Sequence, residues 1–161
     1  MKQLTSATLD GLSLQAQLSP RRRANHNLHE ELSDPVQRLA IAMEPDTHVR
    51  PHRHPHTWEM LLPLRGRFIV LHFDAAGTVV GRTVLGEDCH VLENPAGTWH
   101  GVLSLDRGGV ILEVKHGPYQ PVAESDYAPW YKGDADIEAS AMNAWYARAQ
   151  VGDRYNDIPA N

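Results

Sequence analysis

Short segments that suit β-strands fill the middle of the chain, from residue 35 to residue 117, and leave almost no room for helices between them. Turns that contain glycine separate many of these segments, for example at residues 74–77, 86–88 and 106–109. Seven or eight strands without intervening helices predict an all-β sandwich or barrel rather than an α/β sheet. We expect the strands at residues 35–43, 47–54, 58–64, 67–73, 78–85, 90–94, 99–105 and 109–116.

The two ends of the chain have a different character. Residues 5–18 predict a short helix that ends before Pro20, and a basic segment follows at residues 21–29. Residues 118–134 are rich in proline and aromatic residues, which indicates an arm lying on the barrel, and residues 138–149 have helical spacing. We therefore predict one domain, residues 1–161, made of an N-terminal extension (1–34), a β-barrel (35–117) and a C-terminal arm with a helix (118–161).

Composition excludes several classes of partner. A formal net charge of −5 argues against a nucleic-acid partner, whose binding surface would be basic. The single cysteine, Cys89, cannot form an internal disulfide, which fits a reducing compartment. No apolar run approaches the length of a membrane span, and no segment resembles a signal peptide. We expect a cytoplasmic protein that binds neither nucleic acid nor membranes.

Three histidines and one glutamate have the spacing of a metal site. His52 and His54 are separated by one residue and flanked by prolines, which favour extended backbone, and Glu59 follows them. Alternate side chains of extended backbone share a face, so both imidazoles can reach one ion. His100 follows the turn Pro95-Ala96-Gly97. Neutral imidazoles and a carboxylate suit divalent metals, so we predict that these four residues bind one ion and leave positions open for water or substrate.

These spacings are similar to the two sequence motifs of the cupins: His-x-His-x4-Glu-x6-Gly, ending at Gly66, and Pro-x-Gly-x2-His, ending at His100. One departure is Cys89, which stands where the second motif usually has a glycine. Over roughly residues 20–131 the chain resembles the WbuC family of cupin-fold metalloproteins, in the RmlC-like cupin superfamily. The resemblance implies a jelly-roll barrel, the cupin double-stranded β-helix, which here carries the N-terminal helix and the C-terminal arm and helix. The stretches that carry it are residues 22–29, 34–38, 50–55, 58–59, 64–67, 95–100 and 113–119.

Such a centre supports more than one reaction, and the sequence leaves the metal open among Fe, Mn, Ni, Co and Zn. Fe(II) suits dioxygenase chemistry, whereas the other ions suit Lewis-acid catalysis of isomerisation, epimerisation or hydrolysis. The WbuC resemblance implies a sugar or sugar-nucleotide substrate linked to surface polysaccharide synthesis. We expect a metal-dependent enzyme with a small-molecule substrate; the alternative is a non-catalytic metal- or ligand-binding sensor or storage module.

Glu113 and Lys115 are the candidate catalytic residues. Both side chains project from one face of the predicted strand 109–116, either as a surface pair or into a cavity. The similar Glu-x-Lys segment of the WbuC family favours the cavity. Burial there would lower the pKa of Lys115 and suit it to act as a base or as an anchor for an anion.

Three further features leave alternatives open. The run Arg21–Arg23 is either a solvated charge cluster, which we prefer, or a binding site for a phosphate or carboxylate group. His56 lies close to the predicted ligands, and we expect it at the rim of the site. Residues 68–73 are apolar on both faces, so a dimer partner or the N-terminal helix should cover this strand. We expect a homodimer.

Overall fold

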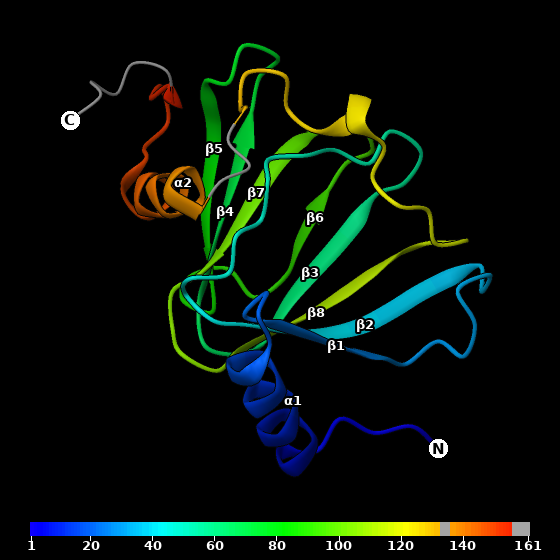
Figure 1. Cartoon of the computed structure of the whole chain (residues 1–161). Helices are drawn as coiled ribbons and strands as arrows, with labels where there is room; N and C mark the ends of the chain where they lie inside the picture. The colour runs from blue at the N-terminus through cyan, green and yellow to red at the C-terminus, as the bar shows by residue number, and fades with distance from the viewer. Residues whose placement is uncertain (133–135, 156–161) are drawn as a thin grey trace.

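The computed structural model describes residues 1–132 and 136–155 (Figure 1). Residues 133–135 and 156–161, which belong to the predicted C-terminal arm and helix, lie outside these ranges. No helix within them is long and apolar enough to cross a membrane. The helices are α1 (Ser6–Leu18), α2 (Asp136–Arg148) and the short 3₁₀ helix η1 (Glu124–Asp126). The strands are β1 (Arg23–Asn27), β2 (Val36–Met43), β3 (Glu59–Arg65), β4 (Phe68–Phe73), β5 (Val79–Leu85), β6 (Leu92–Asn94), β7 (Trp99–Ser104) and β8 (Gly109–His116).

The strands form two antiparallel sheets that face each other. The larger sheet has the order β1-β2-β8-β3-β6, and the smaller one has the order β5-β4-β7. The chain passes from the larger sheet to the smaller one after β3 and after β6, and returns after β5 and after β7. This arrangement is a jelly roll, and the all-β fold class predicted from the strand pattern is confirmed.

Side chains of both sheets meet between them and form a buried core. Except for Val49, which lies in the loop between β2 and β3, its members share an inward position on the period-two alternation of their strands. On β4, for example, Phe68 and Val70 point into this core. The other buried members are Ile41, Met43, Val49, Leu61, Leu85, Val102 and Ile111. The core fills one part of the space between the sheets and leaves the rest to the polar cavity described below.

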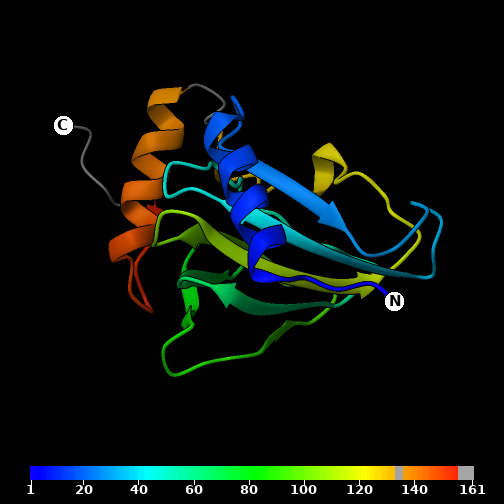
Figure 2. The same ribbon diagram turned by 90° about the horizontal axis from the view of Figure 1, so that it is seen from below.

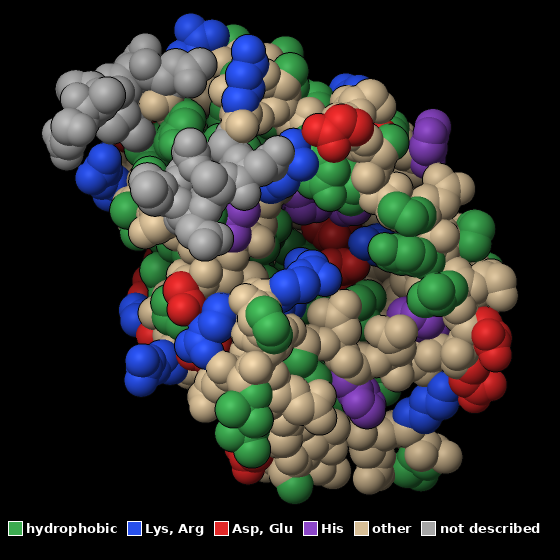
Figure 3. Space-filling view, in the orientation of Figure 1, with side chains coloured by type: hydrophobic (Ala, Val, Ile, Leu, Met, Phe, Trp, Pro, Cys, Tyr) green, Lys and Arg blue, Asp and Glu red, His purple; other side chains and the backbone are tan. Residues whose placement is uncertain are grey.

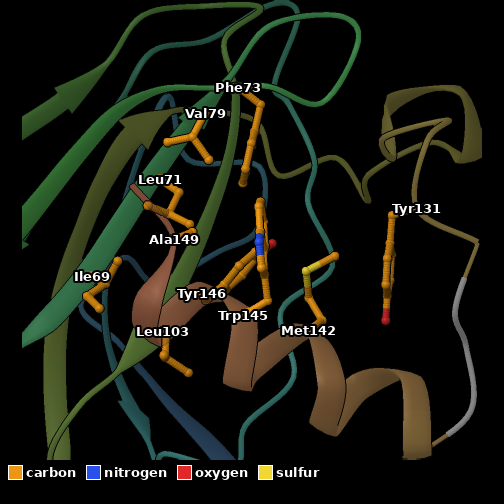
Figure 4. Packing of buried hydrophobic residues seen from close by; sticks show 10 residues of the cluster. All are labelled: Ile69, Leu71, Phe73, Val79, Leu103, Tyr131, Met142, Trp145, Tyr146 and Ala149. Carbon is orange, nitrogen blue, oxygen red and sulfur yellow. The ribbon is translucent and has the colours of Figure 1, made fainter. Parts of the chain in front are cut away.

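The outer face of β4 packs against α2. Ile69, Leu71 and Phe73 point outward, and Figure 4 shows them facing the helix. The helix contributes Met142, Trp145 and Tyr146 to the same cluster, and Ala149, the residue after it, completes the contact. The prediction that a dimer partner or the N-terminal helix covers this strand is therefore wrong, because the C-terminal helix provides the cover. The homodimer itself stays a prediction.

The N-terminal helix, predicted at residues 5–18, covers the other sheet. Figure 2 shows α1 lying across the outer face of the larger sheet. Leu12 and Ala16 of the helix pack against small and branched side chains of β2 and β8, which are Ala40, Ala42 and Val110. The two helices thus cover parts of the two outer faces, α1 on the larger sheet and α2 on the smaller one.

Two segments differ from their predicted structure. Residues 47–54 form a loop rather than a strand, and within them only His52 forms isolated β-bridges. Prolines at positions 51 and 55 lack the N–H groups that a regular ladder needs. In contrast, Arg23–Asn27 forms β1, which was not predicted because arginine, asparagine and histidine have low strand propensity. Pairing with β2 along its whole length overrides that propensity.

A pair of glycine substitutions tests how α2 sits on the smaller sheet. A Cβ atom on Gly101 of β7 would collide with the buried phenol ring of Tyr146, whereas one on Gly11 of α1 would meet nothing within 4 Å. We expect Gly101→Ala to lower the free energy of unfolding by about 2–3 kcal/mol, because a close-packed core cannot absorb the added methyl group. Gly11→Ala should instead raise it by about 0.5–1 kcal/mol. Urea denaturation of both variants checks this, and equal stability of Gly101→Ala and wild type would contradict the packing.

Candidate metal centre

Three separate parts of the chain bring the predicted ligands together. His52 and His54 come from the loop before β3, Glu59 is the first residue of β3, and His100 is the second residue of β7. The turn before β7 is tied to this loop, because the backbone N–H of Gly97 donates to the carbonyl of His54 at 2.9 Å. Gly97 has a φ of +79°, a left-handed conformation that glycine adopts without strain. Both sheets therefore contribute to one site at the end of the space between them.

The three imidazoles form a compact cluster beside the carboxylate. One ring nitrogen from each of His52, His54 and His100 lies within 4.8 Å of the other two. The Oε1 atom of Glu59 lies 3.4 Å from Nε2 of His54, and its Oε2 atom lies 3.2 Å from Nε2 of His100. The structure thus brings together all four residues that the sequence spacing selected, at distances that suit a single ion.

Hydrogen bonds fix which nitrogen of two imidazoles faces the cluster. Nδ1 of His52 lies 2.8 Å from the carbonyl of Arg50, and Nδ1 of His100 lies 2.9 Å from the carbonyl of Thr98. A carbonyl can only accept, so each Nδ1 carries the hydrogen and each Nε2 keeps a free lone pair. Backbone carbonyls commonly orient metal-binding histidines in this way.

The donor atoms of the cluster fit a cation. Among the described residues, Nε2 of His54 and Nε2 of His100 are buried and have no hydrogen-bond partner. In its neutral form Nε2 of His100 is an acceptor that faces another acceptor, the carboxylate of Glu59, and a metal ion between the two atoms relieves the repulsion, as a proton on Nε2 would. A set of lone pairs converging beside one carboxylate is what a divalent metal requires.

The electrostatics of the cluster favour positive charge near Glu59. Burial lowers the pKa of His52 to about 3, so this imidazole is neutral and able to act as a ligand. Burial would also lower the pKa of His100, but the nearby carboxylate of Glu59 outweighs this and raises it. Burial alone would raise the pKa of Glu59. The neighbouring His100 and His54 nevertheless hold this pKa well below its ordinary value. The carboxylate is therefore ionised.

A buried asparagine holds Glu59 in place. Nδ2 of Asn94, at the end of β6, donates to Oε2 of Glu59 at 3.1 Å. The amide oxygen of Asn94 lies 2.6 Å from Nε2 of His72, on β4. The sequence does not indicate a role for Asn94 or His72, because no spacing marks residues that act through another side chain. Both orient a candidate ligand.

We expect Asn94→Ala to weaken metal binding by about 10–100-fold, the usual cost of losing a residue that orients a ligand. Titration with Mn(II) or Zn(II) against a competing chelator measures this. Asn143→Ala is the matched control. The side-chain amide of Asn143 is also a hydrogen-bond donor, but it donates to the backbone carbonyls of Pro45 and Thr47, outside the cluster. Equal loss of affinity in both variants would show a general loss of stability instead of a local effect.

Glu113 and Lys115 point into the cavity next to Glu59. Nζ of Lys115 lies 2.6 Å from Oε1 of Glu113 and 3.9 Å from Oε1 of Glu59. Burial raises the pKa of Glu113, and the charge of Glu59 raises it further. The expectation of a lowered pKa for Lys115 is wrong: burial acts in that sense, but the carboxylates of Glu113 and Glu59 outweigh it and raise the pKa. Lys115 is therefore a cation paired with a carboxylate.

A cavity of about 800 Å³ leads from the surface to the histidine cluster. In Figure 3 the molecule is hollowed near the centre of this face, and histidine, acidic and basic side chains surround the hollow. Its wall includes the four candidate ligands and Glu113 and Lys115. Other charged or polar residues along the wall are Arg21, Arg23, Asn25, Asn27, His29, Gln37 and Arg50. His56 is exposed and is not part of this wall.

The C-terminal arm contacts the loop that carries the histidines. On one side of this loop, His52 and His100 exchange backbone hydrogen bonds of 2.9 and 2.8 Å. On the other side, the N–H of Arg53 donates to the carbonyl of Asp126, and the N–H of Ala128 donates to the carbonyl of Pro51, both at 2.9 Å. An ion pair of 3.0 Å between the side chains of Arg53 and Asp126 adds to this contact.

Comparison with known protein families identifies a match to one of them. The sequence model of the family described as "Domain of unknown function (DUF6016)" matches residues 4–85, half of the chain. The chain belongs to this family. The DUF6016 match includes His52, His54 and Glu59 but ends before His100. Comparison of this DUF6016 chain with curated proteins gives no match.

Several solved structures resemble that of the DUF6016 chain. CapF, in complex with the inhibitor 3-isopropenyl-tropolone, has a TM-score of 0.54 at 16% identity, over 64% of this chain and 30% of CapF. The protein TT1209 from Thermus thermophilus has a TM-score of 0.53 at 20% identity, over 72% and 97% of the two chains. Oxalate oxidase, in complex with the substrate analogue glycolate, has a TM-score of 0.51 at 15% identity, over 65% and 56%. These likenesses show the fold, which is the cupin jelly roll; membership of the WbuC family stays a prediction.

Proposed function

We propose that the chain is a metal-dependent enzyme that converts a small anionic molecule, such as a sugar phosphate or a sugar nucleotide, inside the barrel. The cavity of about 800 Å³ carries this proposal, because it connects the histidine cluster with the surface and is lined by Glu113 and Lys115. Ligand cavities commonly have volumes of about 300–1,000 Å³. A purely structural metal site would instead be closed, and thiolates would be its usual ligands.

The residues that would hold the ion are His52, His54, Glu59 and His100, with the lone pairs of the imidazoles and the carboxylate of Glu59. A divalent ion at this position would supply Lewis-acid polarisation of a carbonyl or hydroxyl group, or, as Fe(II), reactivity with dioxygen. One carboxylate among the four ligands leaves a net positive charge at the centre. Arg21, Arg23 and the other cations of the wall add to it, which favours an anionic substrate.

Glu113 and Lys115 would carry out the proton transfers. Oε1 of Glu113 can accept a proton from a substrate carbon or hydroxyl group, and Nζ of Lys115 can return one to the same molecule. A paired acid and base beside the centre suits isomerisation or epimerisation, which need a proton removed and then added. We therefore favour an isomerase or epimerase over a dioxygenase, for which neither residue has an evident role.

A substrate screen tests the proposal. The purified protein, loaded with Mn(II) or with Fe(II), is incubated with sugar phosphates, sugar nucleotides and diketones, and products are detected by NMR. We expect turnover of at least one anionic sugar with Mn(II) and none after treatment with a chelator. Tight binding of a sugar with no conversion under either metal would support a sensor or storage module instead.

A further inference from the structure

The first strand of the larger sheet presents hydrogen-bond donors to the cavity. Arg23, Asn25 and Asn27 occupy alternate positions of β1 and line the cavity; Ala24, which also touches the cavity, packs against the apolar cluster of α1, β2 and β8. Their partners across the ladder are Met43, Ile41 and Leu39, which also line the cavity but offer no donors. The polar groups on this side of the cavity are therefore concentrated on β1, at the edge of the sheet farthest from Glu59 on β3.

Arg23 is a half-buried cation with one unused donor. Its Nε atom is buried and has no hydrogen-bond partner among the described residues. Burial lowers the pKa of Arg23, and the charge of Glu113 offsets only part of this effect. Arginine nevertheless stays protonated in proteins. A charged guanidinium with a buried donor that has no partner is costly, and an anionic ligand that entered the cavity would remove this cost.

His29, just beyond the other end of β1, has a second unused donor. Its Nδ1 atom lies 3.0 Å from both the N–H and the carbonyl of Arg38. The carbonyl already accepts from the N–H of Leu28 at 2.7 Å, whereas the N–H of Arg38 needs an acceptor. Nδ1 of His29 is therefore the acceptor, and Nε2 carries the hydrogen. This Nε2 is buried and has no partner in the part of the chain that the structure describes. His29 lines the cavity and is only 5% exposed.

We propose that the inward face of β1 binds an anionic, oxygen-rich substrate, and that Arg23 pairs with its carboxylate or phosphate group. The amides of Asn25 and Asn27 and the Nε2–H group of His29 donate to further oxygens along the strand. The inference rests on the proposed function, since it places the substrate in the same cavity, and it assigns the recognition of the charged group to Arg23 instead of the metal. For Arg23, the inference also replaces the expectation that the run Arg21–Arg23 is a solvated charge cluster.

Binding of matched sugars tests this assignment. Glucose 1-phosphate and glucuronate each carry one anionic group, as phosphate and as carboxylate, and glucose carries none. Isothermal titration of the full chain should show that at least one anionic sugar binds at least about tenfold more tightly than glucose, because a charge-assisted pair contributes that much. A preference for only one of the two anionic sugars identifies the group that Arg23 accepts.

Substitution of Arg23 decides the outcome. In Arg23→Gln, the affinities for the anionic sugar and for glucose should differ by no more than about twofold. Arg23→Lys keeps the charge but loses the planar, two-pronged donor geometry of arginine, so it should keep part of the preference. Arg82→Gln is the matched control, since Nε of Arg82 is also buried without a partner but does not line the cavity. Thermal melting shows whether each variant folds. If Arg23→Gln does not fold, the test rests on Arg23→Lys, in which we expect the preference for an anionic sugar over glucose to be several-fold weaker.

The same titrations after treatment with a chelator separate this inference from the proposed function. A preference that survives metal removal and depends on Arg23 supports the inference, even if no sugar is ever converted. The inference is overturned if the preference for an anionic sugar over glucose disappears with the metal but is unchanged in Arg23→Gln and in Arg23→Lys. It is also overturned if the wild type shows no preference for the anionic sugars.

Discussion

Protein carrying the His100→Ala substitution should be purified with almost no bound metal, whereas the wild type should contain close to one divalent ion per chain. His100 is one of four candidate ligands and is almost fully buried, so no water ligand can readily replace its imidazole. Loss of a residue that only orients a ligand costs about 10–100-fold in affinity, and loss of a ligand itself should cost more. Elemental analysis of protein purified without added metal measures the content directly.

His56→Ala is the matched control for this experiment. His56 lies two residues from His54 but is exposed, and it is not part of the histidine cluster. Its removal should leave the metal content unchanged. Equal metal content in wild type, His52→Ala and His100→Ala would refute the site, because the cluster would then have no role in binding.

The second large effect concerns the acid–base pair. With the substrate found in the screen, we expect Glu113→Gln and Lys115→Met to lower kcat by about a hundredfold to ten-thousandfold, the range for loss of a general acid or base. KM should change much less, because substrate binding is assigned to Arg23 and β1. Steady-state kinetics of variants with confirmed metal content measure both constants.

Glu93→Gln provides the comparison, since Glu93 is an exposed acidic residue of β6. It should leave kcat unchanged. A Glu113→Gln variant that keeps full activity and full metal content would remove Glu113 from the mechanism. The alternative that Glu113 and Lys115 form a surface pair would not explain that result, since the side chain of Glu113 lies in the cavity wall.

The convergence of His52 and His54 and the direction of the acid–base pair follow from local rules. Alternation on β8 places Glu113 and Lys115 on one face and Val110 on the other, where α1 covers it. The short spacing of His52 and His54 makes their convergence a local property, which survives although the segment is a loop and not a strand. Such features depend on neighbours in the sequence, so a single chain is enough to predict them.

The rest of the site depends on contacts between distant segments. Nothing near Asn94 in the sequence indicates that it bridges Glu59 and His72, which lie on different sheets. Arg23 looks like part of a surface cluster, because three arginines in a row are usually solvated. It is half-buried in the cavity wall because β1 pairs with β2, and this pairing is a property of the folded sheet. The contact between β4 and α2 also joins distant segments. The apolar sequence of β4 therefore predicts that another element packs on its outer face but does not identify that element as α2.

The contact between the arm and the histidine loop has a consequence for shortened versions of this protein. A chain truncated to the barrel would still encode all four candidate ligands, yet His52 would lie at an open edge with β7 as its only backbone neighbour. Free peptide groups on that edge would exchange with solvent, and the position of the imidazole would become less defined. Among homologues, the presence of the arm should therefore be a better indicator of a working centre than the barrel motifs alone.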